Sequence, residues 1–364
     1  MLRVEITRNI INNNTGTGKR PVLFVRTRKN PAESESLQPP MYESIYHTKD
    51  ISGTSFLVTG GAGFIGSHLA QYLLKSGARK VRVMDSLLTG LQSNIDLFSG
   101  EKSYEFFRGD TRNAEDCKQA CNGIDIVLHQ AALGSVPRSI KDPMTSNAVN
   151  VDGFLQILWA AKEAGVKRFV YASSSSVYGD HPALPKQEEN IGRQLSPYAV
   201  SKYANELYAH VFYSVYKMEI IGLRYFNIFG PRQDPNGPYA AVIPLFIQAL
   251  RKGEAPIIHG DGLQTRDFTF VENAVQANIR AATTSHPEAI GKVYNIAFGE
   301  NYSLLKLYET IQQMIGKTLP PRHVESRAGD IRNSLADISR ARQLLGYNPL
   351  FNMEQGMRIT VDSY

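Results

Sequence analysis

The sequence predicts an α/β protein, a doubly wound parallel sheet joined to a smaller mixed α/β portion near the C-terminus. Between residues 55 and 225, short apolar runs alternate with stretches of helical periodicity, which is typical of a parallel sheet. A glycine-rich turn, Gly61-Ala-Gly-Phe-Ile-Gly66, separates the first apolar run from the first helical stretch. Five prolines between residues 231 and 256 then end the alternation and indicate a loop-rich second portion.

The apolar pattern also gives the order of the elements. Six apolar runs predict strands at 55–59, 80–84, 104–108, 124–129, 167–173 and 219–224. Apolar residues at helical spacing predict helices near 64–76, 115–121, 145–164 and 198–217, and shorter ones near 240–252, 271–284 and 303–315. Helices 145–164 and 198–217 are apolar on more than one face. We expect these faces to pair with a second copy in a homodimer, and burial within one chain is the alternative.

Length and composition are those of an ordinary globular protein. The 364 residues suffice for one large domain or two modest ones, and no apolar stretch approaches the ~20 residues of a membrane span. The two cysteines, Cys117 and Cys121, lie four residues apart without nearby metal-ligand companions. We therefore expect no metal site and a reducing, cytoplasmic location.

Residues 1–40 differ in character from the rest of the chain. They carry seven lysine or arginine residues and three acidic ones, and so hold most of the net charge of +6. The remaining charge is too small to predict a nucleic-acid-binding surface. The segment has neither helical periodicity nor the apolar core of a signal peptide. We expect a poorly ordered leader upstream of a native start at Met41, and a basic targeting sequence is the alternative.

The glycine turn predicts a dinucleotide site. Gly60, Gly63 and Gly66 allow a tight turn between a buried strand and a helix, and let the backbone approach a pyrophosphate. The helix, which opens at Phe64 and Ile65, offers free N–H groups to the phosphates. A purely structural turn is the alternative.

The ends of the next two strands indicate which dinucleotide is bound. Asp85 follows Gly66 by nineteen residues and is suited to the ribose 2′-hydroxyl of NAD. It would repel the 2′-phosphate of NADP, and the five residues after it contain no arginine, so NAD is favoured. Asp110 ends the third strand and is suited to bonding the adenine. A turn-capping role is the alternative for Asp110.

Tyr198 and Lys202 carry the predicted chemistry. Residues four apart on a helix share a face, so the ammonium of Lys202 can approach the phenol. A neighbouring cation favours the phenolate and should lower the pKa of Tyr198 enough for it to act as a base. The alternative is an ordinary surface pair.

Taken together, the motifs resemble those of the extended short-chain dehydrogenase/reductase family over roughly residues 53–362. The motifs are Thr59–Gly66, the serine run 173–176 with Val177-Tyr-Gly179, and the Tyr198/Lys202 pair. Nucleotide-sugar enzymes of that family have motifs similar to Arg224-Tyr-Phe-Asn227, Gly230-Pro-Arg232, Thr265-Arg-Asp-Phe268 and Gly329-Asp330. Segments 129–139 and 178–185 look closest to bacterial UDP-N-acetylglucosamine 4-epimerases of surface-polysaccharide pathways.

The resemblance implies a Rossmann-type NAD domain over 53–225 and a mainly substrate-binding portion over 226–362, with segments returning to the main domain. It implies that Ser174 bridges the sugar oxygen and the phenol of Tyr198, although a polar loop is the alternative for the serine run. The implied cofactor residues are Gly60, Gly63, Phe64, Ile65, Gly66, Asp85, Asp110, Thr111, Ala131, Tyr198, Lys202 and Tyr225. The implied substrate residues are Ser135, Ser174, Ser175, Asn227, Val242, Arg266, Arg327, Asp330 and Ser334.

The implied reaction is NAD-dependent C4 epimerisation of a UDP-N-acetylhexosamine, UDP-GlcNAc to UDP-GalNAc, for polysaccharide precursors. Arg266 and Arg327 suit diphosphate oxygens, with surface salt bridges as the alternative. Ser334 falls at the family's gatekeeper position, where epimerases restricted to unacetylated sugars carry tyrosine. The serine leaves space for a 2-acetamido group, and a solvated residue before Leu335 is the alternative.

Other functions remain open on the same fold. A 4,6-dehydratase would carry an Asp-Glu pair just after the serine of the active-site strand, and Ser174-Ser-Ser-Val177 has no carboxylate. The serious alternatives are a UDP-glucuronate or UDP-N-acetylhexosaminuronate 4-epimerase and a UDP-glucuronate decarboxylase. A catalytically inactive sugar-nucleotide-binding protein is a further alternative from a different class.

Overall fold

The computed structural model of the protein describes residues 41–237, 240–325 and 332–364, which belong to one compact unit. The expected leader, residues 1–40, lies outside the described residues. Within these ranges no helix is long and apolar enough to cross a membrane.

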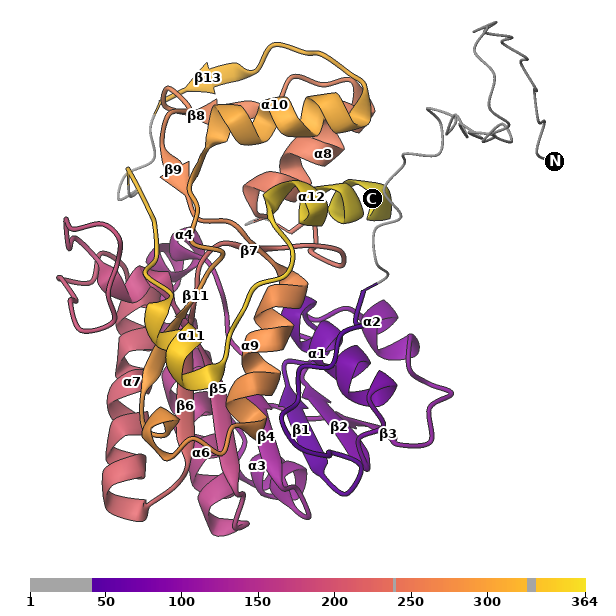
Figure 1. Ribbon diagram of the computed structural model, residues 1–364, viewed down its shortest axis with the longest axis vertical. Coiled ribbons are helices and arrows are strands. Elements are labelled where there is room, and N and C mark those ends of the chain that lie inside the picture. Colours follow the sequence, from indigo (N-terminus) through magenta and orange to yellow (C-terminus); the bar gives the residue numbers. More distant parts are fainter. Residues whose placement is uncertain (1–40, 238–239, 326–331) are drawn as a thin grey trace, which may run out of the picture. The chain divides into compact units, whose positions relative to one another are not determined.

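A seven-stranded, wholly parallel sheet forms the core of the described chain (Figure 1). Its strands lie in the order β11-β6-β5-β4-β1-β2-β3. The strands are β1 (Ser55–Thr59), β2 (Lys80–Asp85), β3 (Tyr104–Arg108), β4 (Ile126–His129), β5 (Arg168–Ser174), β6 (Ile220–Tyr225) and β11 (Val293–Ile296). The six predicted strands are confirmed. β11 is a seventh that the sequence did not indicate, because it lies in the loop-rich second portion.

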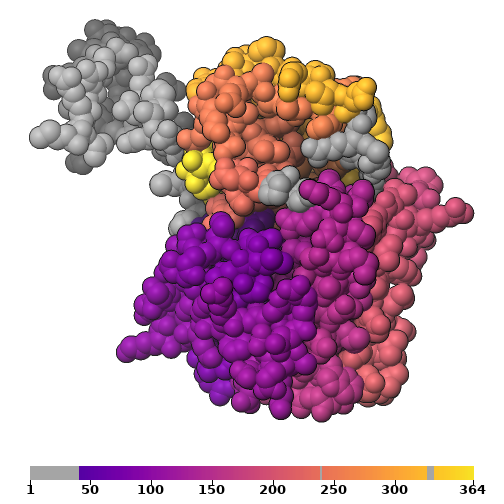
Figure 2. Space-filling model, turned by 180° about the vertical axis from the view of Figure 1, so that it is seen from behind, coloured from indigo at the N-terminus to yellow at the C-terminus, as the bar shows by residue number. Residues whose placement is uncertain are grey.

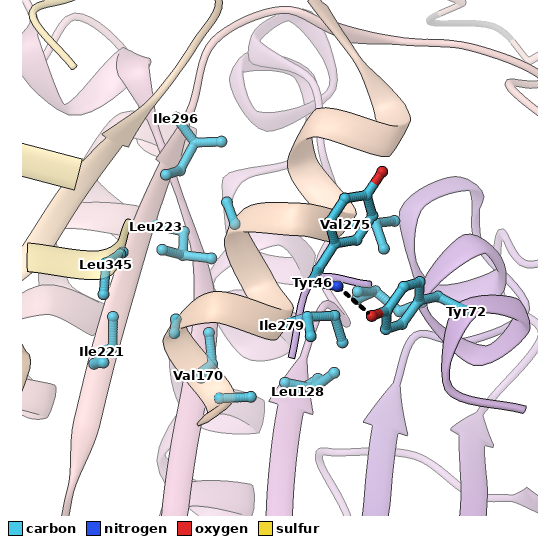
Figure 3. Packing of buried hydrophobic residues seen from close by; sticks show 14 of the residues in the cluster. Tyr46, Tyr72, Leu128, Val170, Ile221, Leu223, Val275, Ile279, Ile296 and Leu345 are labelled. Atoms are coloured by element: carbon cyan, nitrogen blue, oxygen red, sulfur yellow. Dashed lines mark hydrogen bonds between the residues drawn. The ribbon is translucent and has the colours of Figure 1, made fainter. Parts of the chain in front are cut away.

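Helices cover both faces of the sheet, which confirms the doubly wound α/β fold. One face packs against α1 (Phe64–Lys75), α9 (Val271–Thr283) and α11 (Ser339–Leu345). The other packs against α3 (Ala114–Cys121), α6 (Gly153–Glu163) and α7 (Pro197–Tyr216). Successive strand residues point to opposite faces, so Leu128 and Val170 meet Val275 and Ile279 of α9 (Figure 3), and their neighbours pack on the other side.

The predicted helix at 145–164 contains a local irregularity. It consists of α5 (Pro143–Asn147), a π-helical turn (Ala148–Asp152) and α6. The π turn includes the buried Asn150, whose amide group bonds the backbone N–H and C=O of Leu133, at 2.7 and 3.1 Å. Its Nδ2 also donates to Ser201 Oγ of α7. The irregular turn therefore links a loop after β4 to α7.

The second portion has its own apolar cluster above the carboxyl edge of the sheet (Figure 1). The helices of this portion are α8 (Val242–Lys252), α10 (Leu304–Ile315) and α12 (Met353–Ser363). Its strands form three pairs, β7 (Ile228–Phe229) with β10 (Thr269–Phe270), β8 (Ile257–His259) with β13 (Arg322–Val324), and β9 (Thr265–Arg266) with β12 (Tyr302–Ser303). The helices expected near 240–252, 271–284 and 303–315 are confirmed. The sequence did not predict α2 (Gln92–Asp96), α4 (Val136–Lys141), α11 and α12. For α12 the signal was present, a capping box of Asn352 and Gln355.

A buried ion pair ties α7 to the sheet. Arg224 of β6 is 1% exposed and donates to both carboxylate oxygens of Glu206 of α7, at 2.9 and 2.7 Å. Ser173 of β5 donates to the same carboxylate at 2.5 Å, and Arg224 also donates to the Glu188 carbonyl. Breaking such a buried pair by removing one partner typically costs about 3–5 kcal/mol. The position of α7 relative to β5 and β6 is fixed by this contact.

Candidate functional site

A pocket of about 510 Å³ lies at the carboxyl ends of the parallel strands. Figure 2 shows the hollow between the indigo-to-magenta sheet layers and the orange segments. Open α/β sheets bind their ligands at this edge. The predicted residues that line the pocket are Gly60, Gly63, Phe64, Ile65, Gly66, Asp85, Asp110, Thr111, Ala131, Ser174, Tyr198, Lys202, Tyr225 and Asn227. The fold thus gathers residues 167 positions apart in the chain around one cavity.

The glycine turn forms a cradle that side chains would fill. A Cβ on Gly66 would lie 2.2 Å from the carbonyl oxygen of Gly60, and a Cβ on Gly60 would lie 2.7 Å from the backbone nitrogen of Ala131. Gly60 has φ of +69°, a conformation that favours glycine. α1 begins immediately after Gly63 and has no acidic residue in its first turn. The N-terminus of α1 therefore remains suited to an anion.

Asp85 and Asp110 differ in what they bond. The carboxylate of Asp85 accepts from Ala62 N at 3.0 Å and Leu87 N at 2.8 Å, and burial raises its pKa. The Asp110 carboxylate accepts from the backbone and guanidinium of Arg112, and the guanidinium bond lowers its pKa. Asp110 thus caps its own turn, which was the alternative expected for it, and it also lines the pocket. Its contact with adenine stays a prediction.

Tyr198, Lys202 and Ser174 meet in the pocket. Tyr198 and Lys202 lie one turn apart on α7, and Ser174 is the last residue of β5. Tyr198 and Ser174 share a side-chain hydrogen bond. Lys202 is 2% exposed and donates to the carbonyl of Ala172 at 2.9 Å. The pair is therefore not the ordinary surface pair that was the alternative.

Two capping contacts set the start of α7, and with it the position of Tyr198. Ser196 is the N-cap residue, and its Oγ accepts from Ala199 N at 3.1 Å. Pro197 occupies the first helical position, where a missing N–H costs nothing. The N–H of Tyr198, which has no partner within the helix, donates to Ser139 Oγ of α4 at 3.0 Å.

The expected lowering of the Tyr198 pKa is not found. Burial raises the pKa of Tyr198, and only the hydrogen bond to Ser174 opposes this effect. Burial likewise lowers the pKa of Lys202 to about 8, against the attraction of Glu206. The prediction considered the attraction between the two groups and ignored the cost of burying both of them.

Three polar residues beside the site, Gln130, Asn278 and Ser139, were not predicted from the sequence. Tyr225 donates to Gln130 Oε1 at 3.0 Å and accepts from Asn278 Nδ2 at 2.7 Å, while Gln130 donates to Asn278 at 3.1 Å. This closed triangle fixes the ring of Tyr225 in the pocket wall. Ser139, which holds Tyr198, was missed as well. Both Gln130 and Ser139 lie in the motif at 129–139, which was the available signal.

Of the remaining predicted substrate residues, the five that the structure describes do not line the pocket. Ser135 caps α4, Ser175 begins a 3-10 turn after β5 (Ser175–Tyr178), and Val242 begins α8. Arg266 belongs to β9, and Ser334, which is 8% exposed, donates from its N–H to the neighbouring Thr265 carbonyl at 3.1 Å. Ser334 is therefore not the solvated residue of the alternative. Arg327 and Asp330 lie outside the described residues.

Asp267 holds the segments around β9 together. Its carboxylate is fully buried and accepts from the backbone N–H groups of Phe298, Gly299 and Ala336 at 3.1–3.2 Å. Burial raises its pKa to about 7, and these N–H groups oppose the rise. The contact with Ala336 places the chain that carries Ser334 beside β9.

Comparison with known proteins identifies the family. Residues 56–297 match the NAD dependent epimerase/dehydratase family. The chain belongs to that family. A UDP-glucose 4-epimerase from Mycolicibacterium smegmatis is 36% identical over 315 residues, which cover 85% of this chain and 97% of the relative. The family resemblance predicted from the motifs is confirmed.

Two solved structures of the epimerase/dehydratase family are similar to this chain. One is a UDP-N-acetylglucosamine 4-epimerase from Methanobrevibacter ruminantium M1 in complex with UDP-N-acetylmuramic acid, 38% identical with a TM-score of 0.81, covering 85% of this chain and 98% of that one. The other is a UDP-glucuronic acid 4-epimerase from Bacillus cereus in complex with UDP-glucuronic acid and NAD, 33% identical with a TM-score of 0.80 over 85% and 98%.

NAD is the cofactor of the epimerase/dehydratase family, and the pocket fits it. The space beside Gly66 and Gly60 is the kind that a pyrophosphate needs, since a side chain at either position would collide with the backbone. Asp85 supplies a carboxylate at the end of β2 for the ribose. Within the described residues, no group of acidic, histidine or cysteine side chains is arranged to hold a metal ion.

Gly66→Ala should abolish NAD binding, because the added Cβ would lie 2.2 Å from the Gly60 carbonyl and force the turn apart. The matched control is Gly100→Ala, where the added Cβ would meet no atom within 4 Å. The NAD released per mole of denatured protein measures the effect. Full NAD content in Gly66→Ala would show that the turn does not hold the cofactor.

Proposed function

We propose that the protein is a UDP-sugar 4-epimerase that interconverts the gluco and galacto forms of a UDP-N-acetylhexosamine. The observation that supports it best is the placement of Ser174, Tyr198 and Lys202 in one pocket with the glycine cradle. Relatives that act on UDP-glucose, UDP-N-acetylglucosamine and UDP-glucuronic acid have comparable identity to this chain. The sugar must therefore be argued from the residues.

Tyr198 is the proton acceptor in the proposed reaction. Its phenol removes the proton of the sugar 4-hydroxyl, and Ser174, already hydrogen-bonded to that phenol, bonds the same sugar oxygen. When bound, NAD supplies the hydride acceptor and donor, and the positive charge of its oxidised ring favours the phenolate of Tyr198. The alcohol would be inverted by return of the hydride to the opposite face of C4 after the 4-keto sugar has rotated, while the phenol of Tyr198 returns its proton to the 4-oxygen. No external oxidant is required.

Lys202 supports this chemistry with its charge. Its ammonium is anchored to the Ala172 carbonyl and attracted by Glu206, and so stays on the side of α7 that faces the pocket. The lowered pKa of about 8 leaves it charged near neutrality. A cation close to a phenol favours the phenolate, and this is the role proposed for the Lys202 ammonium beside Tyr198.

The acetamido preference rests on Ser334. The residue is buried beside β9, on the segment that Asp267 and Thr265 hold in place. Ser334 does not line the pocket itself, and the proposal is that its small side chain leaves room beside the pocket for a 2-acetamido group that a tyrosine ring would exclude. Ser175 and Asn227 are the proposed hydrogen-bonding partners of the amide. Arg266 and Arg327 are the proposed contacts of the diphosphate, and Asp330 that of the uridine ribose.

The second candidate is a UDP-glucuronate 4-epimerase. The similarity to the Bacillus cereus enzyme favours it, at 33% identity and a TM-score of 0.80. An additional carboxylate on the sugar would need a cationic or hydrogen-bonding partner in the pocket. Incubation of the protein with UDP-GlcNAc, UDP-Glc and UDP-GlcA, with products resolved by NMR, decides among the three sugars. Preference for UDP-GlcA would replace the acetamido proposal.

Tyr198→Phe should retain NAD and lose turnover by on the order of 10²–10⁴-fold, because the ring stays but the acid–base group is gone. NMR of the epimerised product gives the turnover, and absorbance of the released cofactor gives the NAD content. Turnover within threefold of the parent would remove Tyr198 as the base. An inactive parent protein with intact NAD would favour the sugar-nucleotide-binding alternative.

Ser334→Tyr should reduce activity on UDP-GlcNAc and UDP-GalNAc far more than any activity on UDP-Glc, because the ring takes the space of the acetamido group. Losing one buried hydrogen bond to that group weakens the binding of the acetamido sugars by a further ~1–3 kcal/mol. Ser334→Ala is the matched control and should keep the preference. An equal loss on all three sugars would contradict the gatekeeper role.

We also propose that two copies pair through α6 and α7. Phe154, Leu158 and Phe212 are buried, as the single-chain alternative expected. Four of the other apolar side chains of these helices are exposed, Trp159 by 44%, Leu207 by 53%, Val211 by 46% and Val215 by 62%. Light scattering should give the mass of a dimer, and Val211→Glu should give a monomer. A parent protein that is monomeric at micromolar concentration would overturn the proposal.

A further inference from the structure

The segment at 41–52 is packed onto the outer side of α1 and α9. Tyr42 and Tyr46 are 4% and 2% exposed. The backbone N–H of Tyr42 and the phenol of Tyr46 both donate to the buried Glu272 of α9, at 2.8 and 2.6 Å. Tyr46 also stacks on Tyr72 of α1, whose hydroxyl accepts its N–H (Figure 3). We call residues 41–52 the strap.

Tyr42 sits in a backbone conformation that must be held by its surroundings. Its φ is +66°, which is uncommon for a bulky residue. Such strain persists only where neighbouring contacts determine the geometry, and it gathers at functional positions. The contacts here are the carboxylate of Glu272 on one side and the ring of His68 on the other.

His68 connects Tyr42 to the pocket wall. The buried imidazole contacts the Tyr42 hydroxyl through Nδ1 and the Pro231 carbonyl through Nε2, the latter at 2.9 Å. A carbonyl can only accept, so Nε2 carries the proton and Nδ1 accepts from Tyr42. Burial lowers the pKa of His68 to about 3, so the ring remains neutral and this order of donors does not change near neutrality.

The loop that receives this contact is strained and lines the pocket. Three residues in or beside it have positive φ, Asn227 at 38°, Gly230 at 156° and Arg232 at 65°. Arg232 and Gln233 line the pocket together with Tyr198. Arg232 Nη2 donates to Gln71 of α1, and the Tyr364 hydroxyl donates to the Gln233 carbonyl. The loop is thus held from outside by His68 and Gln71 of α1 and by Tyr364 after α12.

We infer that Tyr42 is a positioning residue for the epimerase. Through His68 and the Pro231 carbonyl, Tyr42 holds the pocket loop Gly230–Asp234 in its substrate-binding conformation. Only the kinetic test of this inference depends on the proposed function. Tyr42 then acts on the substrate site, although it precedes the first strand and does not line the pocket.

Tyr42→Phe tests this, because it removes the donor and keeps the ring. kcat/KM for UDP-GlcNAc should fall by on the order of tenfold, mainly through KM, and the affinity for UDP measured by calorimetry should weaken in parallel. NAD content should stay the same. The matched control is Tyr46→Phe, which removes a buried phenol from the same strap but leaves His68 and Pro231 untouched. It should lower the melting temperature and leave KM unchanged.

Coupling to His68 separates positioning from general loss of stability. In a His68→Leu background, Tyr42→Phe should change KM little further, because the path to Pro231 is already broken. His68→Gln, whose amide can still donate to the Pro231 carbonyl, should retain more UDP affinity than His68→Leu. If Tyr42→Phe does not fold, the comparison of His68→Gln with His68→Leu tests the path to Pro231, and equal UDP affinities in these two variants would overturn the inference.

Three outcomes would overturn the inference. They are an unchanged KM and UDP affinity in Tyr42→Phe, equal losses in Tyr42→Phe and Tyr46→Phe that follow the melting temperature, and additive effects of the Tyr42 and His68 changes. Because UDP affinity needs no turnover, the inference stays testable if the parent protein epimerises none of the three sugars. In that case the proposed function fails, and the role of Tyr42 is decided by UDP binding.

Discussion

The buried pair of Arg224 and Glu206 is the contact on which the arrangement of the site depends. α7 carries the tyrosine and the lysine, and β5 carries the serine, so their relative position must be fixed by whatever joins this helix to the sheet. Glu206 bonds Arg224 of β6 and Ser173 of β5 at once. Ser173 is the residue directly before Ser174. A helix dipole or apolar packing alone would allow α7 to slide along the sheet, whereas three directional bonds to one carboxylate set its register.

The same pair also reaches the second portion of the chain. The Arg224 guanidinium lies over the ring of Tyr178, whose hydroxyl donates to Asn295 of β11 at 2.6 Å. Asn295 in turn donates to the carbonyls of Lys186 and Asp337. β11 thus brings the C-terminal segment back to the main sheet. Together with Asp267, this polar network places the chain around Ser334.

Burial sets the electrostatics of the pocket. It raises the pKa of Tyr198 and lowers that of Lys202, so in each case the neutral form is favoured. The charged form of either side chain is therefore most stable when an opposite charge is close by. The strength of Tyr198 as a base thus depends on what occupies the pocket. For the proposed role of Tyr198 as proton acceptor, this means that the phenol becomes an effective base only once a cationic cofactor is bound.

The sequence by itself determined the elements whose signal is local. Six strands and the helices between them followed from apolar periodicity, the cradle from Gly60, Gly63 and Gly66, and the family from motifs that include Tyr198 and Lys202. Only the tertiary structure decided which side chains meet. The path from Tyr42 through His68 to Pro231 joins residues far apart in the chain, and β11 pairs with β6 across an intervening second portion. Such contacts leave no periodic trace, because long-range packing sets them. The predicted lowering of the Tyr198 pKa was wrong for the same reason, since desolvation depends on what surrounds a group in space and not on its neighbours in sequence.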